Sequence, residues 1–591
     1  MSKLAWNDVD WALVQKRVTR QQYRIYKAST ERELFDTGNA KIHSLQRRVI
    51  TSLDAKLLAV RRVTTDNKGR NTGGVDRQLF LSPKEKMDLV YKLKLEGKSS
   101  PIRRTYIPKP GRSDVRPLGI PTIEDRAKQM LAKIALEPEW EAKFEPNSYG
   151  FRPGRSCHDA IQSLYLSLRG TSRYLLDADI QKCFDRIDHD KLLQKLSTFG
   201  LMERQINAWL KADIMTGYSD RPEETFQSLE GTPQGGVISP LLANIALHGM
   251  EDYIKTWYAT NWYLNTGQSR KLSIRDRKSQ IGFSRYADDF VITAPRLADI
   301  EAIKEQVKLW LSEQVGLSLS EAKTQIVNST EGFKFLGFHL ISVKNLSKEQ
   351  YKLKIYPSRA SKAKLIERTR LIIQNNRAAS AYNLIQQLAP RIIGWANYFQ
   401  YSECSKDFTK MDYIIFQQIR AWVFRRKSSG LRSRTKLRDK YFPKGKKYLF
   451  RGKNHENNWI LWGQTKEKHG NIREIFLPKL SWVASRQYVK IKGTASPYDG
   501  NHLYWAKRME KYSGYSHSIS RLIKRQYGRC TICQQPFLAT DVIEIDHIVP
   551  RAKGGSSRFK NLQALHKHCH VQKSRQDNIV NSSIFEQDLL P

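Results

Sequence analysis

The sequence predicts a multidomain α+β protein with more than one hydrophobic core. Between residues 101 and 340, alternating strand patterns mix irregularly with helical patterns, as in an α+β fold rather than a doubly wound sheet. Residues 358–427 follow as a helical bundle, and residues 511–591 form a separate C-terminal domain that contains clustered cysteine and histidine. A chain of 591 residues, 40% of them hydrophobic, has room for three or four such domains.

The charge balance indicates a polyanionic partner. The chain has 101 Lys and Arg against 58 Asp and Glu, a formal net charge of +43, which exceeds what a solvated surface needs. The 13 Trp and the 40% hydrophobic residues exclude a basic protein without cores. Six cysteines, three of them near the C-terminus, favour a reducing compartment with one metal site over a disulfide framework. We find neither a signal peptide nor a membrane-spanning apolar stretch, and therefore expect an intracellular enzyme of nucleic acids.

The N-terminal half is predicted to supply helices and several short strands. Residues 1–100 are mostly helical and basic, and they contain a Gly- and Asn-rich loop at 67–76. Residues 99–122 carry positive charges and prolines around short strands, and a helical pattern returns at 125–137. Residues 174–180 alternate as a strand, which places Asp177 and Asp179 on one face. Two more helical stretches lead to a Gly- and Pro-rich run at 230–240.

The most informative segment is the acidic pair in Tyr286-Ala-Asp-Asp289. The apolar alternation around it predicts two short strands that meet at Asp288 and Asp289. Two adjacent carboxylates repel each other unless a cation lies between them. A divalent metal ion supplies that cation, and metal-bound carboxylates neutralise developing charge in phosphoryl transfer. A solvated acidic turn would explain the pair alone, so the metal-site interpretation depends on the surrounding segments.

The second half predicts a helical bundle followed by a basic segment. Met411, Ile414, Ile415, Ile419, Trp422 and Val423 share one helical stripe and are expected to form core. Residues 420–453 contain fourteen Lys or Arg and one acid, Asp439, which indicates contact with nucleic acid. Residues 493–500 read as a linker. Aromatic residues in and after the basic segment suit stacking on unpaired bases as well as ordinary packing: Tyr441, Phe442, Tyr448, Phe450, Trp459 and Trp462.

Eight segments, taken in order, resemble those of a reverse transcriptase, and more narrowly of the protein encoded by bacterial group II introns. Each segment alone is ambiguous, whereas their order covers almost the whole chain. They are residues 67–76, Tyr106-Ile-Pro-Lys-Pro110 with Arg116-Pro-Leu-Gly-Ile-Pro-Thr122, Ser148-Tyr-Gly-Phe-Arg-Pro-Gly-Arg-Ser156, Asp179-Ile-Gln-Lys-Cys-Phe-Asp185, Gly231-Thr-Pro-Gln-Gly-Gly236, Tyr286-Ala-Asp-Asp289, Lys323-Thr324 and Phe335-Leu-Gly-Phe338. In addition, Gly394-Trp-Ala-Asn-Tyr-Phe399 resembles the thumb, or maturase, segment of that family.

The resemblance implies a polymerase site with two Mg²⁺ ions held by Asp179, Asp288 and Asp289, since phosphoryl transfer needs converging carboxylates. It also implies that the backbone carbonyl of Ile180 is a further ligand. Three other aspartates are expected to be structural: Asp177, which shares the strand face of Asp179, Asp185 and Asp188.

The resemblance also implies a nucleotide pocket. Phe184 would stack beneath the incoming sugar and exclude a 2′-hydroxyl group, which would select dNTPs. Lys109 and Arg116 would hold the triphosphate through charge-assisted contacts, and Gln234 would contact the nucleotide from a Gly-flanked turn. Template phosphates are expected to meet Arg152 and Arg155.

The C-terminal domain contains two ligand pairs with the spacing of a tetrahedral Zn²⁺ site. They are Cys530 with Cys533, and His566 with Cys569, which we expect one turn apart on a helix. His566 departs from the second Cys-x-x-Cys pair of many related domains. His568 could replace it in principle, so the fourth ligand stays open.

Between and after these pairs, the sequence resembles an HNH nuclease of the ββα-metal type. The resemblance implies that His547 is the general base that activates water and that Asn561 orients its imidazole. Asp546 and His570 would hold one catalytic divalent ion. A purely structural zinc ribbon would explain the cysteines but not these four residues together.

The resemblance implies the following domains: an N-terminal extension with the start of the fingers at 1–100, fingers and palm at 101–355, a helical thumb at 356–440, a DNA-binding region at 441–510 and the HNH domain at 511–591. The partners would be the intron RNA, a double-stranded DNA target and dNTPs, without a membrane. We expect a bacterial cytoplasmic protein that associates with the nucleoid when it acts on DNA.

As a function, the resemblance implies a reverse transcriptase and maturase that binds its own intron RNA, assists its splicing and, once that RNA is inserted into one strand of a DNA target, nicks the opposite strand with its HNH domain. The freed 3′ end would then prime the copying of the RNA into cDNA. The alternatives are a reverse transcriptase of another retroelement and an RNA-binding splicing cofactor with vestigial catalytic sites.

Overall fold

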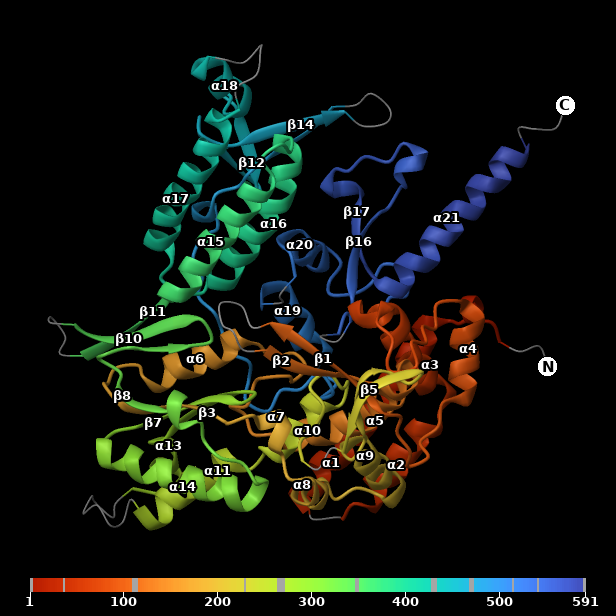
Figure 1. The fold of residues 1–591 in the computed structure, drawn as a ribbon, viewed down its shortest axis with the longest axis vertical. Coiled ribbons are helices and arrows are strands. Elements are labelled where there is room, and N and C mark those ends of the chain that lie inside the picture. Colours follow the sequence, from red (N-terminus) through yellow and green to blue (C-terminus); the bar gives the residue numbers. More distant parts are fainter. Residues whose placement is uncertain are drawn as a thin grey trace.

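The computed structural model describes residues 4–35, 38–108, 115–227, 230–262, 272–345, 350–426, 433–466, 472–512, 515–538 and 541–587. Figure 1 shows a broad body of helices and sheets, above which the long helices within residues 359–424 project. Among the described residues, no helix is long and apolar enough to cross a lipid bilayer. Short 3-10 or π-helical turns lie at Trp6–Asp8, Arg62–Asp66, Lys68–Asn71, Tyr258–Trp262, Glu321–Lys323, Leu480–Trp482, Arg551–Lys553 and Phe559–Asn561.

The N-terminal helices pack around the long helix α5 (Ile123–Lys143). Helix α4 begins at a capping box, in which the Ser82 hydroxyl and the Glu85 carboxylate bind the first free backbone amides, with Pro83 in the first turn. Helix α5 is buried along most of its length, which agrees with the helical pattern expected at 125–137. The surrounding helices are α1 (Trp11–Phe35), α2 (Ala40–Thr51), α3 (Leu53–Arg61) and α4 (Pro83–Lys92).

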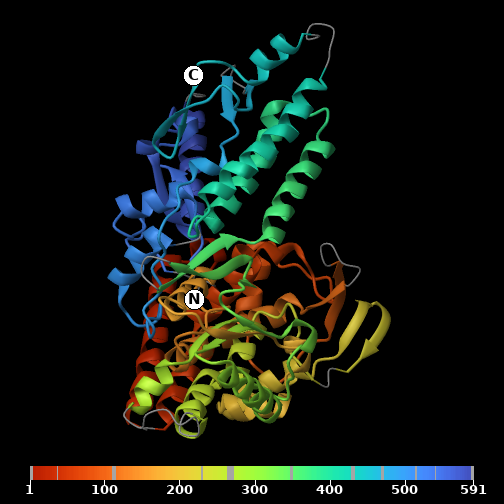
Figure 2. The ribbon, with the colours of Figure 1, turned by 90° about the vertical axis from the view of Figure 1, so that its left-hand side faces the viewer.

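The short strands expected near residues 99–122 belong to a four-stranded sheet of order β2-β1-β4-β5. Its members are β1 (Ile102–Pro108), β2 (Val115–Ile120), β4 (Ile214–Tyr218) and β5 (Arg221–Phe226). Strands β1 and β4 run parallel, and the other two pairs are antiparallel. Figure 2 shows the β4–β5 hairpin projecting from the body on the side opposite the C-terminal elements.

A second, fully antiparallel sheet of order β6-β7-β3-β8 lies between two hydrophobic cores. On β3, Leu176 and Ala178 belong to the core shared with α5, whereas Leu175 belongs to the core shared with the projecting helices. We call this sheet the central sheet. Its strands are β3 (Tyr174–Asp179), β6 (Gly282–Tyr286), β7 (Asp289–Ala294) and β8 (Gln325–Asn328).

Helices surround the central sheet and link it to the first sheet. Helix α14 packs against β3 and β7, and α6 packs against β6. The described helices of this region are α6 (Cys157–Ser167), α7 (Cys183–Arg186), α8 (His189–Leu196), α9 (Gly200–Leu210), α10 (Ser239–Ala246), α11 (Met250–Trp257), α13 (Ile274–Ser279) and α14 (Leu297–Val315).

A three-stranded sheet of order β11-β10-β9 leads into the projecting helices α15 (Arg359–Asn375), α16 (Ala381–Phe399) and α17 (Ser405–Phe424). The helical bundle expected at 358–427 is therefore confirmed. Most of the expected core stripe on α17 is buried, but Ile414 is 42% exposed. The strands are β9 (Phe333–Phe335), β10 (Phe338–Asn345) and β11 (Gln350–Pro357).

The described part of the basic segment contains helix α18 (Arg434–Tyr441) and a first hairpin, and a second hairpin follows it. Tyr441, Phe442 and Tyr448 are buried in this fold, which favours packing over base stacking for these three. Trp459, in contrast, is 44% exposed. The hairpins are β12 (Lys447–Phe450) with β13 (Lys453–Glu456), and β14 (Trp462–Lys466) with β15 (Ile472–Phe476).

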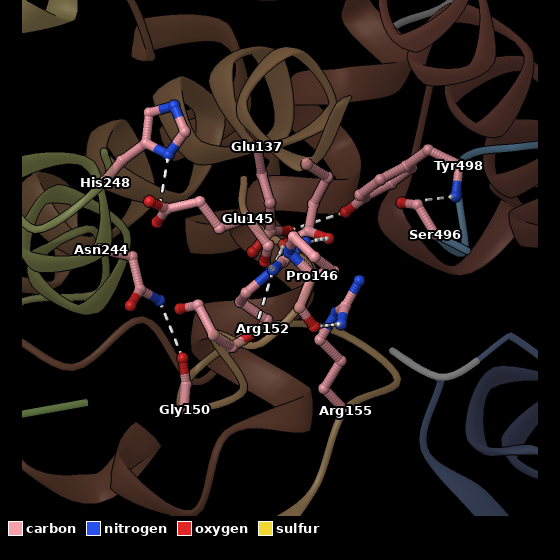
Figure 3. A network of polar contacts seen from close by, with 12 residues as sticks. Glu137, Glu145, Pro146, Gly150, Arg152, Arg155, Asn244, His248, Ser496 and Tyr498 are labelled. Atoms are coloured by element: carbon pink, nitrogen blue, oxygen red, sulfur yellow. Dashed lines mark hydrogen bonds and ion pairs between the residues drawn. The ribbon is translucent and has the colours of Figure 1, made fainter. Parts of the chain in front are cut away.

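Residues 493–500 are not a free linker, and that interpretation was wrong. Tyr498 is buried and donates to Glu137 Oε2 at 2.7 Å (Figure 3). Arg155 reaches the backbone carbonyl of Gly493 at 2.8 Å. The composition suggested a flexible segment, but Tyr498 anchors it to α5. Helix α19 (His502–Tyr512) leads into the C-terminal domain, which contains α20 (His517–Arg525), β16 (Ile543–His547), β17 (Leu562–His566) and α21 (Lys567–Gln587).

A buried ion pair also ties α19 to α6. Arg508 Nη2 lies 2.6 Å from Asp159 Oδ1, and the two side chains are 8% and 0% exposed. Asp159 accepts further hydrogen bonds from Tyr488 Oη and the Ile491 amide. Helix α19, which leads into the C-terminal domain, is thus fixed on the body.

Replacing Arg508 by alanine should strongly destabilise this junction. The change leaves the buried carboxylate of Asp159 without its cation, which costs about 3–5 kcal/mol when one partner of a buried pair is removed. Thermal unfolding and limited proteolysis of the full chain would measure the effect. Lys507→Ala, at the exposed neighbouring position, should stay within about 0.5 kcal/mol of the parent; an equal effect of both variants would contradict the role of the pair.

Candidate active sites

The acidic pair lies where β7 begins, opposite the end of β3. Strands β6 and β7 pair up to Tyr286 and Asp289 and are joined by the turn residues Ala287 and Asp288. In the β3–β7 ladder, Asp179 and Asp289 are direct partners. The structure therefore brings Asp179, Asp288 and Asp289 together at one end of the central sheet, as the sequence predicts.

A buried arginine holds this turn through a hydrogen bond to its backbone. Arg285 is 1% exposed and donates to Ala287 O at 3.1 Å and to Ser148 Oγ at 2.7 Å. Ala287 has φ of +60°, an uncommon conformation for a residue with a side chain. A Cβ atom on Gly150 would lie 2.3 Å from the amide nitrogen of Ala287, so only glycine lets the backbone approach this closely. Sequence reasoning missed Arg285, whose position before the turn gave no chemical signal.

The electrostatics of this site favour a bound cation. Burial, followed by the charges of Asp288 and Asp179, raises the pKa of Asp289 to about 7, and burial also raises the pKa of Asp288. Lys323 Nζ lies 2.8 Å from Asp179 Oδ2 and supplies positive charge at this point. The three carboxylates and the Ile180 carbonyl are hard oxygen donors, which suit Mg²⁺. The role of Lys323 was not predicted, although its segment was part of the resemblance.

Asp177 lies on the same strand face but has a different partner. Gln325 Nε2 donates to Asp177 Oδ2 at 3.0 Å from the neighbouring strand β8. Burial raises the pKa of Asp177 to about 6. The amide contact satisfies the carboxylate within the sheet, which agrees with the structural interpretation of Asp177.

A cavity of about 850 Å³ opens in front of the carboxylates. Phe184 and Gln234 lie in its wall on separate segments, and Asp185 accepts two hydrogen bonds from the Gln234 amide, at 3.0 and 3.2 Å. The Phe184 ring meets the Phe151 ring edge-on at 5.9 Å. Lys109 lies outside the described residues, and Asp289 is not part of the lining. Six of the expected residues line this one cavity: Arg116, Asp179, Ile180, Phe184, Gln234 and Asp288.

The prediction that Arg152 and Arg155 meet template phosphates was wrong. Arg152 is buried and binds both carboxylate oxygens of Glu141, at 2.8 and 3.0 Å. It also donates to the Glu145 carbonyl, beside which Figure 3 shows it. Arg155 binds the carbonyls of Pro146 and Gly493. Their loop reads as basic in the sequence, but the Arg152 guanidinium is enclosed by acceptors no more than eleven residues away along the chain. That of Arg155 also reaches the carbonyls of the distant residues Gly493 and Ala495.

The C-terminal domain contains a second group of ligands. Cys530, Cys533, His566 and Cys569 place one ligand atom each within 4.8 Å of one another, the one such group in the part of the chain that the structure describes. Three sulfur atoms and one imidazole nitrogen suit tetrahedral Zn²⁺. His566 Nε2 lies 3.2 Å from Asp541 Oδ2, while its Nδ1 faces Cys533 at 3.3 Å. Such a carboxylate would fix the orientation of a metal-binding histidine.

Two details of this group differ from expectation. His566 ends strand β17, and α21 begins only at Lys567, so His566 and Cys569 do not lie one turn apart on a helix. His568 stacks on His566 with ring centroids 5.0 Å apart, but it is not in the cluster. The structure thus selects His566 as the fourth candidate ligand.

Beside this cluster, β16 and α21 bring Asp546 and His570 together. His570 Nε2 lies 3.5 Å from Asp546 Oδ1, and its Nδ1 lies 2.7 Å from Glu544 Oε2. Glu544 was not assigned a role from the sequence, although it stands two residues before Asp546 on the same strand face. Lys573 Nζ also approaches Asp546, at 3.0 Å.

His547 ends β16 with its imidazole toward the following loop. Its Nε2 lies 3.3 Å from Ser557 Oγ. The Asn561 side chain binds the amide and carbonyl of Val549 and the carbonyl of Ser556. These contacts hold the backbone of the loop that follows His547. We expected Asn561 to orient the His547 imidazole directly, but in the structure its side chain binds this loop instead.

Comparisons with known proteins agree with this division of the chain. The family described as reverse transcriptase (RNA-dependent DNA polymerase) matches residues 107–340, and that of the N-terminal domain of reverse transcriptase matches 6–93. The group II intron maturase-specific domain matches residues 362–442, and the HNH endonuclease family matches 530–576. These ranges contain both clusters of candidate residues.

Relatives show the same relationship along the chain. Protein YkfC of Escherichia coli K12 is 36% identical over 302 residues, 47% of this chain and 78% of that protein. The group II intron-encoded protein LtrA of Lactococcus lactis subsp. cremoris is 31% identical over 319 residues, 46% of this chain and 53% of LtrA. The matched region thus spans only about half of LtrA. The chain belongs to the family of group II intron-encoded proteins, with reverse transcriptase, maturase-specific and HNH endonuclease segments in one polypeptide.

Proposed function

We propose that this protein binds its intron RNA and assists its splicing. With that RNA inserted into one strand of a DNA target, its HNH segment would nick the opposite strand, and its polymerase site would extend the freed 3′ end by copying the RNA. The main support is the single cavity lined by Asp179, Asp288, Phe184 and Gln234 in a chain that also carries an HNH segment. A nuclease and a polymerase in one chain can act in sequence, because the cut strand becomes the primer.

In this proposal the central sheet is the palm, the β2-β1-β4-β5 sheet belongs to the fingers and α15–α17 form the thumb. Asp179, Asp288, Asp289 and the Ile180 carbonyl would hold two Mg²⁺ ions, which supply charge stabilisation at the reacting phosphate. Arg116 and Lys109 would bind the triphosphate, and Gln234, held by Asp185, would contact the nucleotide.

The nuclease site would use His547 as general base, with Asp546 and His570 holding one divalent ion. Glu544 would orient His570 through its Nδ1 atom. The Cys530, Cys533, His566 and Cys569 group would bind a structural Zn²⁺ that fixes β17 and α21 relative to each other.

The proposed partners are the intron RNA, a double-stranded DNA target and dNTPs, with action in the bacterial cytoplasm and at the nucleoid. The formal charge of +43 supports a polyanionic partner. The proposed domain boundaries are 1–100, 101–355, 356–440, 441–510 and 511–591.

Two reactions on separate substrates would test the proposal. The purified protein should extend a DNA primer annealed to an artificial RNA template, and its complex with the intron RNA should nick duplex DNA carrying the target. Extension without nicking would favour a reverse transcriptase of another retroelement. Splicing assistance without either reaction would mean an RNA-binding cofactor with vestigial sites.

Replacing Phe184 by valine should weaken discrimination against ribonucleotides. The smaller side chain opens space beneath the sugar, where a misfit of this size is worth roughly 10–100-fold in selectivity. Primer extension with dNTPs and with NTPs on the same RNA template would give the ratio of kcat/KM values. Phe151→Val removes the neighbouring ring of the same cavity and is the matched control. Unchanged sugar selectivity in Phe184→Val would rule out the proposed gate.

A further inference from the structure

A second large cavity lies between the reverse transcriptase segment, the maturase-specific segment and the residues that lead into the HNH segment. Its volume is about 700 Å³, and its walls come from α6, the end of α16, the β12–β13 turn and helices α19 and α20. Figure 1 shows α20 between α16 and the β16–β17 pair. The proposed polymerase and nuclease sites do not include this cavity.

Positive charge dominates this cavity. Arg451, Arg486, Lys511, Arg521 and Lys524 line it, against one lining carboxylate, which belongs to Glu510 and lies 3.4 Å from Lys524. Within the described residues, the Arg486 guanidinium has no carboxylate partner, and Arg451 donates only to the amide oxygen of Asn397. Cations gathered in this way repel one another, so an anion with several negative charges would stabilise them.

Aromatic rings lie beside these cations. The rings of His158 and Tyr401 have centroids 4.8 Å apart, and those of Tyr401 and Tyr512 are 6.4 Å apart. All three residues line the cavity and keep part of their surface exposed. Arginines next to accessible aromatic rings suit a strand whose bases are unpaired, because phosphates meet the cations and bases stack on the rings.

The cavity continues toward the nuclease site. A neighbouring cavity of about 360 Å³ shares Asn397, Arg451, His517 and Arg521 with it and extends to Phe559. The Arg521 guanidinium lies 4.3 Å from the centre of the Phe559 ring. Phe559 stands two residues before Asn561, which holds the loop after His547.

Another wall of the cavity packs on the β9–β10 hairpin of the three-stranded sheet. Tyr398, in its wall, donates to the carbonyl of Leu336 at 2.9 Å and stacks on Phe338 at 5.3 Å. These residues lie in the β9–β10 hairpin, and Tyr286 packs in the same core, next to the acidic turn. We call the two joined cavities the junction groove.

We propose that the junction groove binds single-stranded DNA, with Arg451 and Arg486 on its phosphates, and guides the cut strand from the nuclease site to the polymerase site. The proposal depends on the proposed function, since the nuclease supplies that strand. Duplex DNA does not present unpaired bases to the rings, whereas a strand leaving a nick does. The groove thus assigns a binding role to residues of three different segments.

Binding of a fluorescent oligothymidine to the full-length protein at several salt concentrations tests the proposal. Arg451→Ala/Arg486→Ala should weaken binding about tenfold or more and reduce the slope of log affinity against log salt by about 1.4, the value for two lost phosphate contacts on a single strand. Arg24→Ala/Arg48→Ala removes the same charge from exposed positions on α1 and α2 and should retain the parent slope. Thermal unfolding and zinc content would verify the fold of each variant.

A coupled assay completes the test. With the RNA complex and duplex target, the groove variant should convert a smaller fraction of nicked strands into cDNA. An unchanged salt slope, equal losses in the control variant, or loss of RNA binding with unchanged DNA binding would each overturn the inference. Failure of the parent protein to nick or to extend would instead contradict the proposed function.

Discussion

Asp289→Ala is expected to abolish cDNA synthesis, while the protein continues to assist the splicing of its intron RNA. Asp289 pairs directly with Asp179 across β3 and β7, beside Asp288. Removing one of three converging carboxylates weakens metal binding where several kcal/mol of charge stabilisation are needed, so the rate of primer extension should fall about 10³-fold or more. Extension on an artificial RNA template, a splicing assay and opposite-strand nicking would be measured on the same preparation.

Asp177→Asn is the matched control for this variant. It removes a carboxylate from the same face of β3, two residues from Asp179, but its contact with Gln325 can persist as an amide pair. Primer extension should therefore stay within about a few-fold of the parent, since nothing in the metal site changes. If Asp177→Asn abolished extension and Asp289→Ala did not, the assignment of the metal carboxylates would be wrong. Loss of splicing in Asp289→Ala would mean that the site is needed for the fold.

His566→Asn is expected to release zinc and unfold the nuclease segment. In small zinc-finger peptides, structural zinc contributes roughly 10–16 kcal/mol of binding free energy that is also folding free energy. The core around this cluster is small and includes two of its own cysteines, Cys530 and Cys569. Opposite-strand nicking should disappear, whereas primer extension on an artificial template should persist, because Asp179 and Asp288 lie in a different core region.

His568→Asn is the control, because it changes a buried histidine stacked on His566 that is outside the ligand group. Zinc content, measured by atomic absorption on the full-length protein, should be about one per chain in the parent and in His568→Asn, and near zero in His566→Asn. Loss of zinc only in His568→Asn would reverse the choice between the two histidines. Retained nicking without zinc would contradict a structural role for the metal.

The strongly patterned elements could be predicted from the sequence. The strands around Asp179 and Asp289, the helix at 125–137 and the bundle at 358–427 follow from local periodicity, which survives in the fold. Residues 493–500 could not be predicted, because their Gly, Ser and Pro content is equally compatible with a linker and with a docked segment. The difference depends on Tyr498 finding Glu137, which is 361 positions away.

The candidate site shows the same division. The residue type and spacing of the carboxylates, cysteines and histidines predict their chemistry. The structure groups the carboxylates at one end of the central sheet and the cysteines with His566 in the C-terminal domain. The roles of Arg152, Arg155 and Arg285 could not be predicted in this way. The sequence does not distinguish an arginine that binds a phosphate from one that donates to a buried carbonyl. Only tertiary contacts separate Arg285, which is buried and holds the acidic turn, from Arg486, which lines the junction groove.

The central claim is partnership with one intron RNA, and the most direct measurement is sequencing of the RNA that co-purifies with the protein from its native host. One dominant structured RNA, whose gene encloses this reading frame, is the predicted result. That RNA would also supply the sequence of the DNA target. A mixture of unrelated RNAs would contradict the claim and would identify the basic surface as nonspecific.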